Sequence, residues 1–131
     1  MTSRIRILAA ADHLADTVPH VVALDNDADP FAHSEAIAQA DRIELHFPSF
    51  TDGRAFSQAY LIRRRLGFSG DLRATGDVLA DQLIQMERTG FSSAVLADGV
   101  DPADAQRQLD RFAAFYQGDV ARDAPFRQNS R

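Results

Sequence analysis

The chain has 131 residues, 45% of them hydrophobic and 25% charged, as is usual for one ordinary globular domain. It contains no Cys and no Lys, since all 14 basic residues are Arg; this excludes thiol nucleophiles, disulfides, thiolate-bound metals, Schiff bases and a Walker lysine. The net charge of −5 argues against nucleic acid binding, and no apolar tract matches a membrane span or secretory signal, so we expect a cytoplasmic protein.

Residues 1–19 carry two competing patterns and receive no assignment. The apolar residues between positions 5 and 8 suit a short edge strand, whereas residues 8–16 suit a turn of helix. A single α/β domain is predicted over residues 20–118. It opens with a short apolar strand at Val21–Leu24.

Asp-Pro pairs mark the start of two helices. Pro30 suits the first helical position, where its missing N–H would have no partner, and Asp29 is held extended as an N-cap; this helix runs to about residue 40. Asp101 and Pro102 begin a second helix in the same way, with an apolar stripe of Ala105, Leu109, Phe112 and Tyr116. Gly118 ends that helix, and residues 119–131 are predicted to form a polar tail.

The middle of the chain alternates strands and helices. The strand Arg42–Phe47 places its apolar residues on one face and Arg42, Glu44 and His46 on the other, and residues 72–75 alternate likewise. Helices are predicted from Arg54 to Leu66 and from residue 77 to residue 90, followed by a strand at residues 94–97.

Recurring strand–helix units predict an α/β fold of βαβ units, with a mainly parallel sheet of four to five strands that is flavodoxin-like or resembles part of a barrel. The polar face of two strands is unusual, because parallel sheets are normally apolar on both faces. Three explanations are open: a polar barrel-like interior, packing on a second subunit, or a position at the sheet edge. A Glu44–Arg73 pair across neighbouring strands would fit the first two.

Ligands of parallel sheets bind beyond the carboxyl ends of the strands, so the turns that follow the strands are the candidate ligand sites. In the turn Thr51-Asp52-Gly53-Arg54, Gly admits an anion to the backbone and Arg offers a bidentate fork. The alternative interpretation is a tight turn that caps the next helix. The same two interpretations, a ligand site or a helix cap, apply to Gly76, Asp77 and Asp81.

His46 or Asp52 could serve as a general base, although a satisfied histidine and a capping carboxylate are the commoner roles. The acids Asp25, Asp27, Asp52 and Asp77 could converge on Mg²⁺, but they also suit caps and turns, and we predict no metal site. Arg63, Arg64 and Arg65 complete a helix C-terminus without needing a ligand. No dinucleotide fingerprint is present.

The segment TDGRAFSQAYLIRRRLGFSGDLRATGDVLADQLIQMERTGF, together with a later DP…F…YQ element, resembles a bacterial family of unknown function, domain-of-unknown-function family 934. Some members carry an oxidoreductase label, and members are typically encoded beside assimilatory sulfite reductase, which implies a role in sulfite or sulfate assimilation. The positions that match the family's shared residues are Asp52, Gly53, Arg54, Arg73, Gly76, Asp77, Asp81 and Gln82.

Two functions follow as hypotheses. In the first, the protein is an accessory of sulfite reduction that binds a partner enzyme, such as sulfite reductase, or a small anion, through Thr51 and these shared positions. In the second, it is a small enzyme in which Asp52 or His46 is the base and Arg54 with Arg73 holds an anionic substrate. No cofactor is evident, flavin or nicotinamide binding stays open as a third reading, and a homodimer is open as well.

Overall fold

The structure is a computed structural model that describes residues 5–49 and 51–111 and contains a parallel sheet of five strands. The strands lie in the order β1-β5-β4-β3-β2 and comprise β1 (Arg6–Leu8), β2 (Val21–Leu24), β3 (Arg42–Phe47), β4 (Asp71–Gly76) and β5 (Ser93–Val95). The α/β class and the parallel sheet are therefore confirmed. The predicted bounds of β2 and β3 are confirmed as well.

Five helical segments connect or follow the strands. They are α1 (Ala10–Ala15), a 3-10 turn (Pro30–His33) leading into α2 (Ser34–Gln39), α3 (Arg54–Tyr60) continued by a π-helix (Leu61–Arg65), a 3-10 turn (Ala80–Gln82) leading into α4 (Leu83–Thr89), and residues 102–111. Residues 1–19 thus hold both of the elements that competed for them, first a strand and then a helix. The predicted tail, with Phe112, Tyr116 and Gly118, lies outside the described residues.

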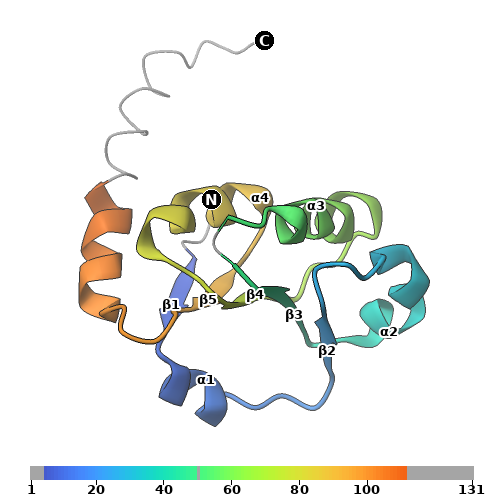
Figure 1. Cartoon of the computed structure of the whole chain (residues 1–131). Helices are drawn as coiled ribbons and strands as arrows, with labels where there is room; N and C mark the ends of the chain where they lie inside the picture. Colours follow the sequence, from blue (N-terminus) through green and yellow to red (C-terminus); the bar gives the residue numbers. More distant parts are fainter. Residues whose placement is uncertain (1–4, 50, 112–131) are drawn as a thin grey trace, which may run out of the picture.

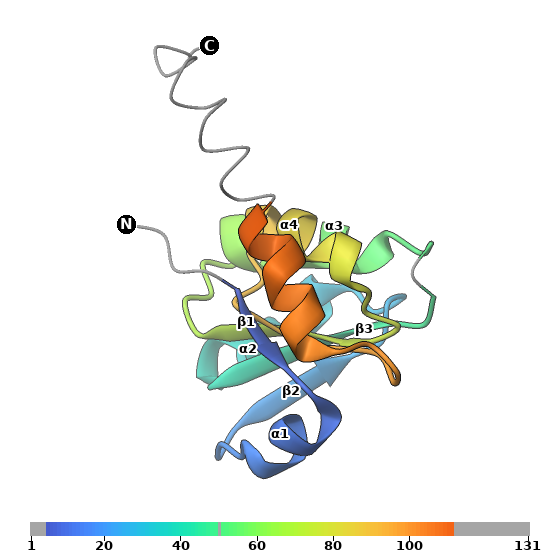
Figure 2. The same cartoon turned by 90° about the vertical axis from the view of Figure 1, so that its left-hand side faces the viewer.

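The strand order explains why the helices form two layers. From β2 to β5 each step moves to the neighbouring strand in one direction, whereas the connection through α1 runs back across the sheet from β1 to β2. Since such crossovers are right-handed, reversing the direction places the helix on the opposite face. α3 and α4 accordingly cover one face and α1 lies on the other (Figure 1), while residues 102–111 flank the β1 edge (Figure 2).

The hydrophobic core fills the layer between the sheet and α3 with α4. The inward residues of β3 and β4 are paired in register, with Ile43 beside Leu72 and Leu45 beside Ala74, and all four are fully buried. They pack in one cluster with buried helix residues that include Ala55, Ala59, Ile62, Leu83 and Met86. In the described part of the chain, no helix is long and apolar enough to cross a membrane.

The Asp-Pro starts work as predicted. Asp29 Oδ1 accepts a hydrogen bond from the Phe31 N–H at 3.0 Å, and Asp101 Oδ1 accepts one from the Ala103 N–H at 3.0 Å. These contacts satisfy donors at the start of each helix that have no partner within the helix.

The polar face of β3 and β4 is not explained by a position at the edge of the sheet. The prediction of an edge position is wrong, because β4 and β3 are interior strands of the sheet. Glu44 and Arg73 do lie side by side in register, but Glu44 accepts from Arg42 Nε at 3.0 Å, while Arg73 bonds to partners on β4, β5 and the α1 side. The polar face is covered in part by α1, which meets it through charged and polar groups.

Arg63 has a structural role that its place in a run of three arginines did not reveal. Its Nε donates to the Gly90 carbonyl at 2.8 Å, and its Nη1 donates to the carbonyls of Phe68 at 3.0 Å and Gly70 at 2.8 Å. Burial lowers the pKa of this guanidinium from its ordinary value. Arg63 therefore fastens the end of the π-helix to the turns that precede β4 and β5.

Candidate functional site

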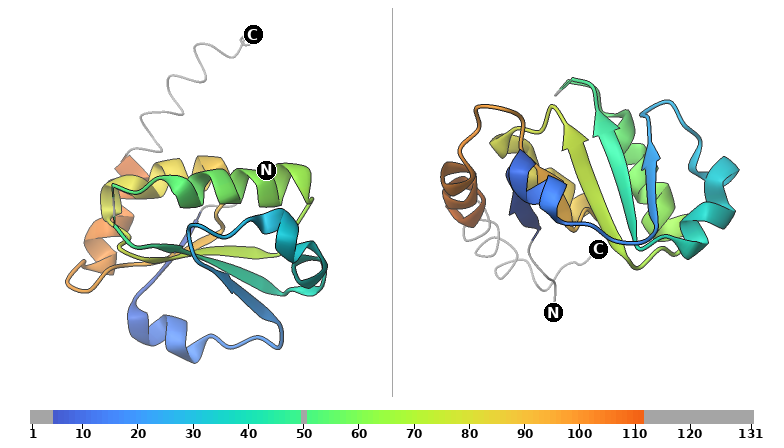
Figure 3. Two further views of the ribbon diagram at one scale, coloured as in Figure 1. Left: turned by 45° about the vertical axis from the view of Figure 1, so that its right-hand side comes forward. Right: turned by 90° about the horizontal axis from the view of Figure 1, so that it is seen from below.

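The turns that follow β2, β3, β4 and β5 lie at one end of the sheet, because all the strands run parallel (Figure 3). We call this surface the carboxyl edge and define it as residues 25–28, 49, 51–54, 77–81 and 96–99. Most of the predicted site residues belong to it, including Thr51, Asp52, Gly53, Arg54 and Asp77. The edge is where ligands of parallel α/β sheets bind.

Asp52 and Arg54 form a bidentate ion pair on the carboxyl edge. Arg54 Nη2 donates to Asp52 Oδ2 at 2.9 Å and Arg54 Nε donates to Asp52 Oδ1 at 3.2 Å, while the Arg54 backbone N–H also donates to Oδ1 at 3.1 Å. Asn26 Nδ2 donates to Asp52 Oδ2 at 2.6 Å and so links the turn after β2 to the turn after β3. The Arg54 side chain is 63% exposed, so its outer face is open to solvent.

These contacts fix the ionisation of Asp52. The hydrogen bonds from the Arg54 side chain and backbone, with its charge and a bond from Asn26, lower the pKa of Asp52 to about 2. A carboxylate with so low a pKa is a weak proton acceptor at neutral pH. Asp52 therefore suits a fixed ion pair better than the role of general base.

The ion pair predicts a pH effect that Asp52→Asn should remove. Since folding lowers the pKa of Asp52, its contribution to stability is complete above pH ~4 and is lost as the pH falls towards about 2. Urea unfolding at about pH 5 and at about pH 2 should show a smaller loss of stability in acid for Asp52→Asn than for the wild type. Arg54→Met should reduce the same loss, and an unchanged acid profile in both variants would contradict the ion pair.

Gln58 holds the turn after β2 in place and was not among the predicted site residues. Its side chain is on α3, the residue is 4% exposed, and its Nε2 donates to the carbonyls of Asp25 at 2.7 Å and Ala28 at 2.8 Å. Among the described residues, its Oε1 is a buried polar atom without a hydrogen-bond partner. The only signal in the sequence is a polar residue beside the apolar stripe of this helix.

His46 lines an open hollow of about 450 Å³ at the carboxyl ends of β3, β4 and β5. The other lining residues are Phe47, Pro48, Gly76, Asp77, Leu96, Ala97 and Asp98. Gly76 has φ 94°, and a Cβ there would lie 2.3 Å from the Phe47 carbonyl and 2.9 Å from His46 Nδ1. The structure thus brings His46, Gly76 and Asp77 together, in a hollow that Asp52 and Arg54 do not line.

Asp81 and Gln82 lie at the start of the helical segment that leads to α4. Asp81 is exposed in the first turn, and Gln82 Oε1 accepts a hydrogen bond from the Leu79 N–H at 3.2 Å. Gln82 therefore has a capping role at this helix start.

Arg73 is separated from the other predicted site residues. Its side chain projects from β4 onto the face opposite α3, whereas Arg54 is the first residue of α3. It is fully buried and donates to Ser93 Oγ at 2.8 Å, to Asp16 Oδ2 at 2.6 Å and to Asp71 Oδ2 at 3.0 Å. The structure therefore does not assemble Arg54 and Arg73 into one clamp.

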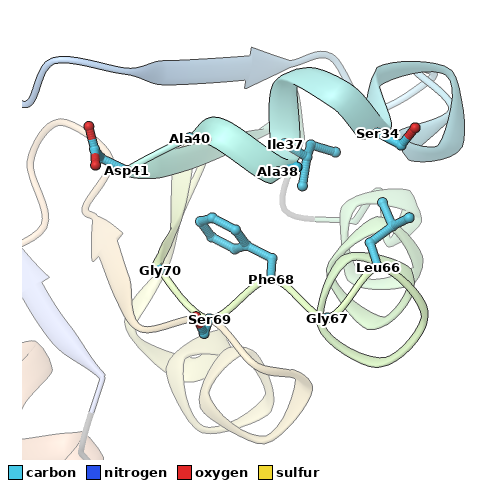
Figure 4. A pocket seen from close by; sticks show the side chains of 10 residues that line it. All are labelled: Ser34, Ile37, Ala38, Ala40, Asp41, Leu66, Gly67, Phe68, Ser69 and Gly70. Carbon is cyan, nitrogen blue, oxygen red and sulfur yellow. The ribbon is translucent and has the colours of Figure 1, made fainter.

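A further hollow, of about 580 Å³, lies at the amino ends of β3 and β4 between α2 and the turn 66–70. Figure 4 shows Ile37, Leu66 and Phe68 at its sides, with Asp41 at one end. It contains none of the predicted site residues. In the described part of the chain, no group of three or more His, Asp or Glu side chains is placed to hold a metal ion.

Comparison with known proteins places the chain in a family of unknown function. No curated protein and no solved structure matches it. A family model described as "Bacterial protein of unknown function (DUF934)" matches residues 21–127, a range that contains the carboxyl edge. The chain therefore belongs to the DUF934 family of bacterial proteins.

Proposed function

We propose that this protein is a cytoplasmic accessory protein of assimilatory sulfite reduction, and that it binds a partner enzyme through the carboxyl edge without catalysing redox chemistry itself. The observation that carries the proposal is the Asp52–Arg54 pair, whose 63% exposed arginine presents a charged surface at the end of the sheet where ligands bind. The sulfite pathway rests on the resemblance described above. The proposed partner is sulfite reductase.

The charge of the carboxyl edge favours a protein partner over a small anion at this surface. Around Arg54 the edge carries six carboxylates, at Asp25, Asp27, Asp52, Asp77, Asp81 and Asp98, and four of these residues are exposed. One paired guanidinium among six carboxylates gives little attraction for an anion. The same arrangement complements a basic patch on another protein and would speed their encounter.

Capture of sulfite reductase from the same organism on the immobilised protein tests the partner. Asp81→Asn combined with Asp98→Asn should weaken binding about threefold to tenfold, because two exposed charges are removed from the interface. Asp12→Asn combined with Glu35→Gln is the matched control, since it removes two exposed carboxylates from α1 and α2. Equal binding by both double variants, or no capture by the wild type, would contradict the proposal.

Arg54→Ala tests the edge in the cell. We expect it to abolish growth on sulfate as the sulfur source and to leave growth on a reduced sulfur source unchanged, because the exposed side chain is not part of the core. Growth rate and the amount of folded protein are the measurements. Normal growth on sulfate would return Arg54 to a purely structural role.

The second candidate function is a small enzyme with His46 as its base, favoured by the place of His46 in the hollow beside Asp77 and Asp98. Among the described residues that line this hollow there is no arginine, which is unfavourable for an anionic substrate. His46→Asn separates the two candidates. Loss of growth on sulfate with sulfite reductase capture intact would support the enzyme, and normal growth would support the accessory protein.

A further inference from the structure

The carboxylate of Asp16 lies among three arginines on the sheet face that α1 covers. Its Oδ2 accepts from Arg73 Nη2 at 2.6 Å and from Arg6 Nη2 at 3.0 Å, and lies 3.7 Å from Arg42 Nη1. Arg73 is fully buried and Arg42 is 5% exposed, so two of the three guanidiniums are held in place by the fold. Their hydrogen bonds and charges lower the pKa of Asp16, with Arg73 contributing most.

The guanidiniums are also oriented by groups other than the Asp16 side chain, although Arg42 Nη1 donates to the Asp16 backbone carbonyl at 2.9 Å. Arg73 Nε donates to Ser93 Oγ at 2.8 Å and Arg73 Nη2 also donates to Asp71 Oδ2 at 3.0 Å. Arg42 Nε donates to Glu44 Oε2 at 3.0 Å. The arginines would therefore keep much of their arrangement if the Asp16 side chain moved away.

His13 lies beside the cluster on α1. Its Nδ1 is 2.9 Å from Arg73 Nη1, and its Nε2 is 3.9 Å from Glu44 Oε1. Without Asp16, three arginines face two carboxylates, Asp71 and Glu44. The cluster would then carry a net charge of about +1 before any screening.

The α1 segment that carries Asp16 is attached to the sheet mainly through polar groups. α1 has no buried residue, and its largest apolar side chain, Leu14, is 79% exposed. Asp16 itself borders an open hollow of about 590 Å³ that is also lined by Arg6, Arg42 and Asp71. Solvent ions can thus approach Arg6 and Arg42, whereas the fully buried Arg73 becomes accessible only if the Asp16 side chain moves aside. Because α1 has no buried residue, that movement would expose no apolar core.

We propose that Arg6, Arg42 and Arg73 form a binding site for a small divalent oxyanion, such as sulfate or phosphate, and that Asp16 occupies this site in the structure described here. Asp16 directs a single oxygen at three guanidiniums, whereas a tetrahedral dianion has separate oxygens for each. The site lies under α1, on the face opposite α3 and apart from the carboxyl edge. It does not depend on the function proposed above.

Asp16→Asn tests the site by removing the internal carboxylate. The thermal midpoint of this variant should rise with sodium sulfate relative to sodium chloride at equal ionic strength, and titration calorimetry should give one sulfate site at least about tenfold tighter than in the wild type. Asp12→Asn, which removes an exposed charge from the same helix, should behave as the wild type. Similar responses to sulfate in all three proteins would overturn the proposal.

A second variant and a second measurement locate the site. Adding Arg6→Met to Asp16→Asn should remove most of the gain, and because Arg6 is 60% exposed this change should leave the fold intact. If Asp16→Asn folds only when sulfate is present, the proposal is supported. In the wild type, saturating sulfate should increase amide exchange within α1, and equal exchange in sulfate and chloride would count against displacement of Asp16.

Discussion

Arg73→Met is expected to lower the free energy of unfolding by about 3 kcal/mol, because it leaves buried polar partners without their cation. Asp16 and Asp71 both bond to this fully buried guanidinium. Their side chains are 35% and 28% exposed, so water would recover part of the lost interaction and keep the cost at the lower end of the range for buried pairs. Urea unfolding at neutral pH measures the change.

The control for this prediction is Arg65→Met, an exposed arginine for which we expect a change within about 0.5 kcal/mol. Combining Arg73→Met with Asp16→Asn should cost less than the sum of the single changes, because each removes the same interaction. If Arg73→Met were as mild as Arg65→Met, or if the double variant were additive, the ion network under α1 would not stabilise the fold.

Gly76→Ala is expected to destabilise the protein by about 3 to 5 kcal/mol, from backbone strain and steric overlap together. Residue 76 has φ 94°, and a Cβ there would lie 2.3 Å from the Phe47 carbonyl, which belongs to the sheet and cannot move freely. The same Cβ would lie 2.8 Å from Cε1 of the His46 ring. The hollow at the carboxyl edge should therefore be disturbed as well as the fold.

Gly67→Ala separates the two causes. Gly67 also has a positive φ, 71°, but a Cβ there would meet no atom of residues 5–49 and 51–111 within 4 Å. We expect it to cost about 1 to 2 kcal/mol, the usual penalty for a left-handed residue. Equal losses at positions 67 and 76 in urea unfolding would show that the contact with Phe47 and His46 is unimportant.

The helices and strands were predicted well where the apolar periodicity agreed with the residues that start or end an element. The alternation of β3 identified its apolar and polar faces, and the Asp-Pro pairs located two helix starts. Short elements at the N-terminus escaped assignment, because a three-residue strand and a six-residue helix each span fewer than two repeats of their periods, too few for a clear pattern. The resemblance correctly indicated the family.

The candidate site was only partly predictable, because several polar residues have partners far away in the chain. Gln58 supports the turn after β2, and Arg63 binds carbonyls of the turns before β4 and β5. A side chain that satisfies buried backbone groups looks in the sequence like any exposed polar residue. Its role depends on which turn the fold brings to it.

The sequence by itself determined the class of fold, the helix starts and the two faces of the central strands, because these depend on neighbouring residues and on the periods of helix and strand. Only the tertiary structure decided that β1 lies beside β5 and that α1 crosses the polar face. That crossing brings His13 to Arg73 across 60 positions and Asp16 to Arg73 across 57. Such pairings follow from the packing of the whole chain, and they moved Arg73 from the predicted edge site to a buried ion network.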